Sequence, residues 1–161
     1  MSKNITTDPI AQLMQEHDET LRQLQKLNKA SKSLLEHGFS EDHFDQVLSS
    51  LQFIHEEVNH HNQKEEQALF PILERYVEGP THLMKKDHRK LYKYFTRLRS
   101  VVTKVGKNKK NSQAVKELAQ VAREVIQIFV NHIHKENYVL FPLVQKFLSK
   151  EELREVAKKM L

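Results

Sequence analysis

The sequence predicts an all-α fold, an up-down-up-down four-helix bundle with a short C-terminal helix. Apolar residues recur every three or four positions over long stretches, which is the spacing of one helix face. Only three glycines and four prolines interrupt these stretches, so there is little material for the turns of a β fold. A chain of 161 residues has the length of one ordinary domain, and long helices with short connections pack as a bundle. We therefore expect residues 1–161 to form a single domain.

The first two helices are marked by residues that favour helix ends. Asp8 followed by Pro9 is typical of a helix start, because the carboxylate caps free N–H groups and proline suits the first helical turn. We expect this helix to run to about Glu36 and to end at Gly38. Ser40 then predicts the start of the second helix in the same way.

Proline and glycine also divide the second half of the chain. We expect Pro71 to kink the second helix or nearly end it, and Gly79 to stop it. Pro80 predicts the start of the third helix. The polar stretch 106–111 predicts the next break, after which Ser112 is expected to cap the fourth helix.

The last predicted helix is short. Ser149 stands three residues before Glu152, which is the spacing of a capping box at a helix N-terminus. We expect this helix to cover one end of the core.

The sequence repeats itself at an offset of 71 residues. Leu-Phe-Pro at 69–71 matches Leu-Phe-Pro at 140–142, and apolar positions correspond at the same offset. The repeat predicts two similar helical hairpins, 9–71 and 80–142. Histidines and glutamates repeat as well: His17 with His88, His61 with His132, and Glu65 with Glu136.

Six of these polar residues are predicted to meet inside the bundle. A histidine and a glutamate four residues apart lie one turn apart on one helix face. Counting about 1.5 Å per residue from the predicted turns puts His17 level with His61, about 30 Å from the turn. Buried carboxylates and imidazoles without a partner would be costly, so a bound cation explains the set better than a dry polar core. The predicted ligands are His17, His61, Glu65, His88, His132 and Glu136.

The other histidines are expected at the surface or the rim of the bundle. His60 is turned about 100° from His61, and His134 lies nearly opposite His132. His37 lies about 30 Å from His17 along a straight helix, too far for a shared site. The remaining three are His43, His55 and His82.

The amino-acid composition excludes several classes of function. The absence of cysteine excludes disulfides, thiol catalysis and cysteine-ligated metal on this chain. The net charge of +5 is modest, and we interpret the lysines of 104–110 as a solvated loop, so no nucleic-acid partner is expected. No apolar run approaches the roughly 20 residues of a membrane span, and the N-terminal MSKNITTDPIAQ lacks a signal-peptide segment. We expect a cytoplasmic protein without a membrane partner.

These residues resemble the hemerythrin-like (HHE cation-binding) family over about residues 8–147. The resemblance implies a non-haem centre of two iron ions with an oxo or hydroxo bridge, held by the four histidines and two bridging glutamates. The matching segments are Glu16-His17-Asp18, HNQKEEQALFP from His61 to Pro71, Asp87-His88, and HIHKENYVLFP from His132 to Pro142.

The resemblance leaves two classes of function open. Oxygen-carrying hemerythrins use a fifth histidine four residues from another on the third helix, but here those positions hold Met84 and Tyr92. We therefore expect a di-iron protein that binds, senses or responds to oxygen, nitric oxide or iron, with a small diatomic ligand as partner. The alternative is an enzyme-like peroxide scavenger or iron-sulfur cluster repair factor with the same centre. Repair members often carry an N-terminal cysteine-bearing segment, which we do not expect here.

Two neighbours of the predicted site have two interpretations each. Tyr92 is interpreted as an ordinary core aromatic, with a contact near His88 as the alternative. Glu57, one turn before His61, either offers an extra carboxylate or is exposed to solvent.

Overall fold

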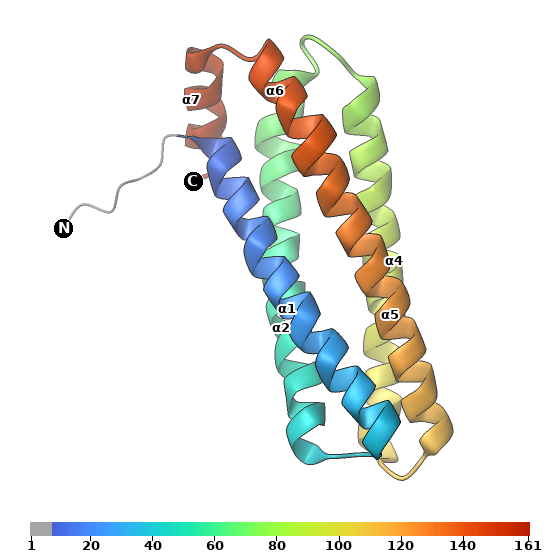
Figure 1. Cartoon of the computed structure of the whole chain (residues 1–161). Coiled ribbons are helices and arrows are strands. Elements are labelled where there is room, and N and C mark those ends of the chain that lie inside the picture. Colours follow the sequence, from blue (N-terminus) through green and yellow to red (C-terminus); the bar gives the residue numbers. More distant parts are fainter. Residues whose placement is uncertain (1–7) are drawn as a thin grey trace, which may run out of the picture.

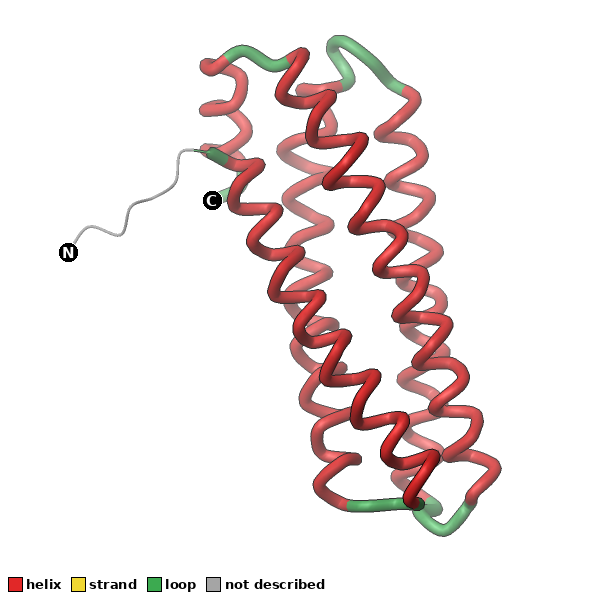
Figure 2. Tube along the Cα trace, in the orientation of Figure 1, coloured by secondary structure: helices red, strands yellow, loops and turns green. Residues whose placement is uncertain are grey.

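The computed structural model describes residues 8–161, and every secondary-structure element in that range is helical. The long helices lie side by side and are joined by short loops (Figures 1 and 2). The prediction of an all-α chain is confirmed. The elements are α1 (Pro9–His37), α2 (Glu41–Lys64), η1 (Glu65–Leu69), α3 (Phe70–Leu73), α4 (Gly79–Lys107), α5 (Ser112–Lys135), η2 (Glu136–Leu140), α6 (Phe141–Phe147) and α7 (Lys150–Lys159).

The core has two apolar clusters, with the predicted ligands between them along the helix axes. Helix α1 packs against α2 and α5, and α4 packs against α5, whereas the backbones of α2 and α4 approach each other less closely. The larger cluster includes Leu27, Val47 and Leu98, at the end near the α1–α2 and α4–α5 loops. The smaller one includes Leu69 and Phe141 and lies near α7. The polar layer is therefore closed at both ends by apolar packing.

Several predicted helix ends are confirmed. The Asp8 carboxylate accepts hydrogen bonds from the N–H groups of Ile10 and Ala11, at 3.0 and 3.2 Å. Gly38 ends α1 with a φ of 84°, a conformation that glycine adopts without a Cβ clash. Ser40 caps α2.

Two boundary predictions are wrong. Gly79 does not stop the second helix, because that helix already ends at Leu73 and Gly79 is the first residue of α4. Ser112 is the first residue of α5 and not its cap. The cap is Asn111, whose side-chain oxygen accepts from the N–H groups of Gln113 and Ala114 at 3.1 and 3.2 Å. Asparagine caps as well as serine does, so the sequence offered two equivalent starts.

A π-helical turn carries α2 past Pro71 without ending it. In η1 the N–H of Phe70 bonds to the carbonyl of Glu65, five residues back, and η2 repeats this between Phe141 and Glu136. Proline lacks an N–H and its ring clashes with the carbonyl four residues earlier. A widened turn just before the proline accommodates both effects, and such turns are common at functional sites.

Helix α7 covers one end of the core, as predicted. The Ser149–Glu152 capping box is present in full. Val156 and Met160 are buried against the smaller apolar cluster, and α7 contacts both α1 and η1. Among residues 8–161, none of the helices combines the length and hydropathy that a membrane span requires. The prediction about a signal peptide rests on residues 1–7 in part, and these lie outside the described residues.

Candidate metal centre

The fold brings the six predicted ligands together in one buried layer. Each of the four histidines is 7% exposed or less, and both glutamates are fully buried. They form two groups of four that share both glutamates, and each group could hold a metal ion. That the six residues ligate metal stays a prediction. The first group is His17, His61, Glu65 and Glu136, and the second is His88, His132, Glu65 and Glu136.

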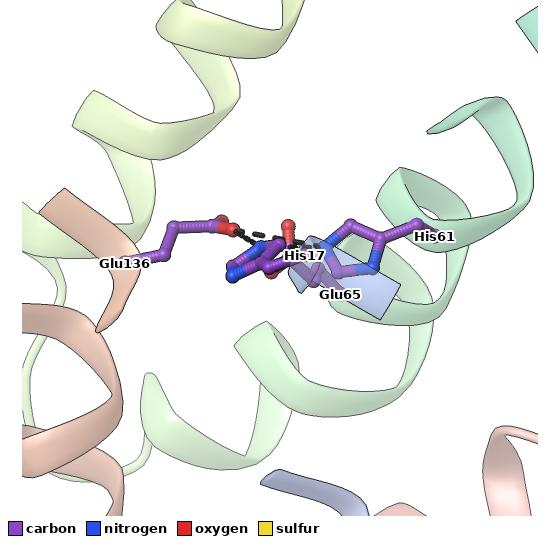
Figure 3. Close-up of side chains that lie close together, drawn as sticks. All are labelled: His17, His61, Glu65 and Glu136. Carbon is purple, nitrogen blue, oxygen red and sulfur yellow. Dashed lines mark hydrogen bonds and ion pairs between the residues drawn. The ribbon is translucent and has the colours of Figure 1, made fainter. Parts of the chain in front are cut away.

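The first group has the side chains of His17, His61, Glu65 and Glu136 pointing toward one another (Figure 3). The two Nε2 atoms of His17 and His61 lie 3.1 Å apart. Glu136 Oε1 lies 2.8 Å from His17 Nε2, and Glu65 Oε2 lies 3.3 Å from His61 Nε2. Three helical segments and η2 therefore converge on one point.

The second group repeats this arrangement with the other carboxylate oxygens. Glu65 Oε1 lies 3.1 Å from His88 Nε2, and Glu136 Oε2 lies 3.3 Å from His132 Nε2. Each carboxylate thus turns one oxygen toward each group. That is the arrangement a carboxylate needs to bridge two ions.

The distances between the donor atoms fit a bound cation, and so do the buried donor atoms that lack a hydrogen bond. Two ligand atoms about 2.1 Å from one ion, at right angles, are about 3.0 Å apart, close to the separations in both groups. Several of these buried atoms make no hydrogen bond, although a buried polar atom without a partner is costly. Imidazole nitrogen and carboxylate oxygen inside a helical bundle form a donor set that iron takes. The atoms without a hydrogen bond are both oxygens of Glu65, Oε2 of Glu136, and Nε2 of His88 and of His132.

The orientation of each histidine ring is fixed by a hydrogen bond from Nδ1 to a side chain outside the two groups. The Nδ1–H of each ring donates to a polar side chain, which directs Nε2 inward and leaves it as the nitrogen that a metal ion would bind. The four contacts are His17 to Asn137 at 2.7 Å, His61 to Glu16 at 2.8 Å, His88 to Glu66 at 2.5 Å, and His132 to Asp87 at 3.2 Å.

Lysines complete two of these outer contacts. Lys64 lies 2.6 Å from Glu16, and Lys135 lies 3.0 Å from Asp87. Burial alone would raise the pKa of Glu16, but its hydrogen bonds with His61 and Lys64 lower the pKa to about 2. These carboxylates are therefore ionised at neutral pH and accept from the imidazoles.

The carboxylates of the centre also act on the imidazoles. Burial alone would lower the pKa of His88, but the nearby carboxylates of Glu136 and Glu65 raise it to about 11. Burial opposes the charged form of His61 and His132 too, and again carboxylates raise the pKa of each ring. Without metal, the His88 imidazole is protonated at neutral pH. A bound cation would take the place of that proton.

Sequence reasoning missed the outer partners of the histidines. The 71-residue offset could have found them, because it relates Glu16 to Asp87 and Lys64 to Lys135 in the same way as it relates the ligands. The outer residues lie on helix faces that periodicity assigns to solvent, so burial gave no reason to single them out.

The other candidates lie apart from the two groups. His37, His60, His82 and His134 are exposed, and His43 and His55 are partly exposed. The prediction that Tyr92 is a core aromatic is wrong, since its exposure is 63%. Leu91 and Phe95 take the inward positions on α4 and leave Tyr92 at the edge. Glu57 is exposed, and Met84 is buried in the smaller cluster.

A polar cleft of about 860 Å³ reaches the second group from outside. It lies between α2 with η1 on one side and α4 on the other, where the two backbones approach each other less closely. His88 and Glu66 line it together with Asn62, Lys85 and Tyr92. A small polar molecule can therefore approach the edge of the centre through this cleft.

The sequence of this chain is similar to those of curated proteins and matches a family model. Curated relatives include the iron-sulfur cluster repair protein YtfE of Salmonella paratyphi B (strain ATCC BAA-1250 / SPB7), Salmonella newport (strain SL254) and Salmonella heidelberg (strain SL476). Each is 31% identical over 93 residues, which is 55% of this chain and 42% of the relative, so the match spans under half of their length. The family model of the hemerythrin HHE cation-binding domain matches residues 8–144. The chain therefore belongs to the hemerythrin HHE cation-binding domain family.

Proposed function

We propose that this chain is a non-haem di-iron protein in which the six buried donors hold two ions and both glutamates bridge them. The observation that carries the proposal is the two-sided placement of each carboxylate. Glu65 turns Oε2 toward His61 and Oε1 toward His88, and Glu136 turns Oε1 toward His17 and Oε2 toward His132. Family membership supports metal binding at this position.

We infer that the chain is one domain. In it, the hairpins 9–71 and 80–142 form an up-down-up-down four-helix bundle that α7 closes. Each hairpin supplies two histidines and one glutamate, so the complete set of donors needs both hairpins.

We infer that the centre binds or senses a small diatomic ligand, oxygen or nitric oxide. Two irons, when bound, supply redox-active ions with coordination positions that the six residues leave free. The chain's residues hold the imidazoles in one tautomer, exclude water with apolar clusters at both ends, and leave the polar cleft beside His88 as an approach. The fifth histidine of the oxygen carriers is replaced here by Met84 or Tyr92, so binding or sensing is favoured over oxygen storage.

The second candidate function is enzyme-like, as a peroxide scavenger or an iron-sulfur cluster repair factor. The similarity to curated proteins named for iron-sulfur cluster repair favours this candidate. These 161 residues contain no cysteine, so they would contribute no thiol to a repair reaction. The same six donors would serve in both cases.

One experiment separates these functions. The protein is purified with iron available, its metal content is measured, and the reduced anaerobic form is exposed in turn to oxygen, nitric oxide and peroxide while absorbance is followed. Two irons per chain and reversible, stoichiometric binding of a gas support the binding or sensing function. Repeated turnover of peroxide supports the scavenger. One zinc and no iron under iron-replete conditions would overturn the di-iron proposal.

A further inference from the structure

The outer contacts of the two metal-binding groups match at the 71-residue offset except at one position. Glu16, which accepts from His61, corresponds to Asp87, which accepts from His132. Glu66 corresponds to Asn137. The first pair conserves the negative charge, whereas the second pair has a carboxylate in one half and a neutral amide in the other.

This difference acts directly on two of the imidazoles. His88 donates its Nδ1–H to the carboxylate of Glu66 at 2.5 Å, and His17 donates its Nδ1–H to the amide oxygen of Asn137 at 2.7 Å. An ionised acceptor forms the stronger hydrogen bond and makes the ring a better electron donor at Nε2. The His88 ring is therefore the stronger of these two donors.

The charge of Glu66 is also the least compensated of the outer carboxylates. Glu16 and Asp87 each have a lysine within ion-pair distance, at 2.6 and 3.0 Å. Among residues 8–161, no lysine or arginine lies within that distance of Glu66, whose ion pair is with His88. Lys85 and Arg89 act on Glu66 from farther away, and both line the open cleft, where water and salt screen them.

The two lysines also favour metal binding by the second group over the first. Only 10% of the Lys64 side chain is exposed, beside the first group, whereas 53% of the Lys135 side chain is exposed, beside the second. A buried positive charge repels a metal ion more strongly than one that water screens. The first group therefore has a neutral partner on one histidine and a less screened cation near the other.

We propose that Glu66 makes the two halves of the centre unequal, so that the group containing His88 and His132 binds its metal ion first and more tightly. Glu66 is a positioning residue, because it acts on the ion through the His88 ring. The inference rests on the proposed function only in that the six donors bind two ions.

The test uses zinc, which has no redox chemistry, and two isosteric variants that exchange the charges. Metal-free protein is titrated with zinc in a calorimeter, and the histidine rings are followed by nitrogen-15 NMR. Glu66→Gln removes the charge in the second half, and Asn137→Asp introduces one at the matching position in the first half. Far-ultraviolet circular dichroism of each metal-free variant checks that the helices are retained.

Unchanged protein should show two steps, with the rings of His88 and His132 shifting at the first equivalent of zinc. Glu66→Gln should weaken the first step by about 10–100-fold, the usual effect of removing an outer partner of a metal-ligating histidine. Asn137→Asp should strengthen the second step. The variant that combines Glu66→Gln with Asn137→Asp should show two separate binding steps in the reverse order. A merely structural role of Glu66 would not produce this result.

Three outcomes would overturn the inference. Filling of the His17 and His61 group first would contradict the proposed order. An unchanged order in the double variant would show that Glu66 does not set it, while two bound ions would leave the proposed function standing. Failure of the unchanged protein to bind two ions would overturn both.

Discussion

The ring of Phe141 stacks on the imidazole of His17, with centroids 5.5 Å apart and planes inclined by 16°. Phe70 stacks on His88 in the same way, at 6.1 Å and 15°. Both phenylalanines are buried, and both come from the Leu-Phe-Pro segments of the repeat. Each of these segments therefore holds a histidine of another helix in position, in addition to shaping its own helix.

Replacing Phe141 should affect the metal centre as well as the core. Phe141→Leu leaves a small cavity and removes the stacking on His17, so it should lower the free energy of unfolding by about 1–2 kcal/mol. It should also speed loss of metal to a chelator, because the His17 ring is less restrained. Phe44→Leu is the control, since Phe44 is 6% exposed and belongs to the other cluster. Equal rates of metal loss in the two variants would contradict the stacking argument.

The glutamates should matter more than any single histidine. Glu65→Ala or Glu136→Ala removes a donor from both groups, whereas His17→Ala removes one from the first group only. Metal analysis should show loss of the paired centre in the glutamate variants and a damaged but occupied centre in His17→Ala. His60→Ala and His134→Ala, both exposed in the unchanged chain, should keep the full metal content. An empty site in His60→Ala would refute the assignment.

Stability and metal affinity should respond to pH in opposite directions. Folding without metal raises the pKa of His88 from 6.5 to about 11, so its contribution to stability is complete below about pH 6.5 and is lost as the pH rises toward 11. Metal-free protein should therefore lose stability between about pH 7 and 10. Metal affinity should rise over the same range, because only neutral imidazole ligates. Thermal unfolding with and without metal measures both, and a metal-free protein that gains stability would contradict the prediction.

The corrected start of α5 gives a direct test of capping. Asn111→Ala removes the acceptor for two backbone N–H groups and should cost about 1 kcal/mol of unfolding free energy. Ser112→Ala changes the first helical residue and should cost little. Denaturant unfolding of the two variants measures the difference, and a larger loss in Ser112→Ala would restore the original assignment.

The helical elements could be predicted from the sequence because several independent signals indicate the same elements. Helical periodicity, the caps at Asp8 and Ser40 and the break at Gly38 all indicate the same elements. The repeat then related the histidines and glutamates of one hairpin to those of the other, and distances counted from the turns placed His17 level with His61. The periodicity, caps and breaks depend on neighbouring residues, and the repeat is a property of the sequence, so none of them requires knowledge of helix packing.

The remaining features depend on contacts between helices. A proline in a helical pattern predicts a kink or an end, and the pattern alone does not predict the π turn with which the helix continues past Pro71. Tyr92 stands four residues after His88, but Leu91 and Phe95 take the buried positions on α4 and Tyr92 is exposed. Partners of the Nδ1 atoms come from neighbouring helices, which periodicity does not place.

The sharing of donors makes the two hairpins dependent on each other. Each group of four takes three residues from one hairpin and one glutamate from the other, and the turn between them, residues 74–78, supplies none. A cut in the backbone at Glu78 would therefore remove no donor, yet would leave two fragments that are each incomplete. Added metal should therefore strengthen the association of such fragments, beyond the apolar contacts that already join the two hairpins.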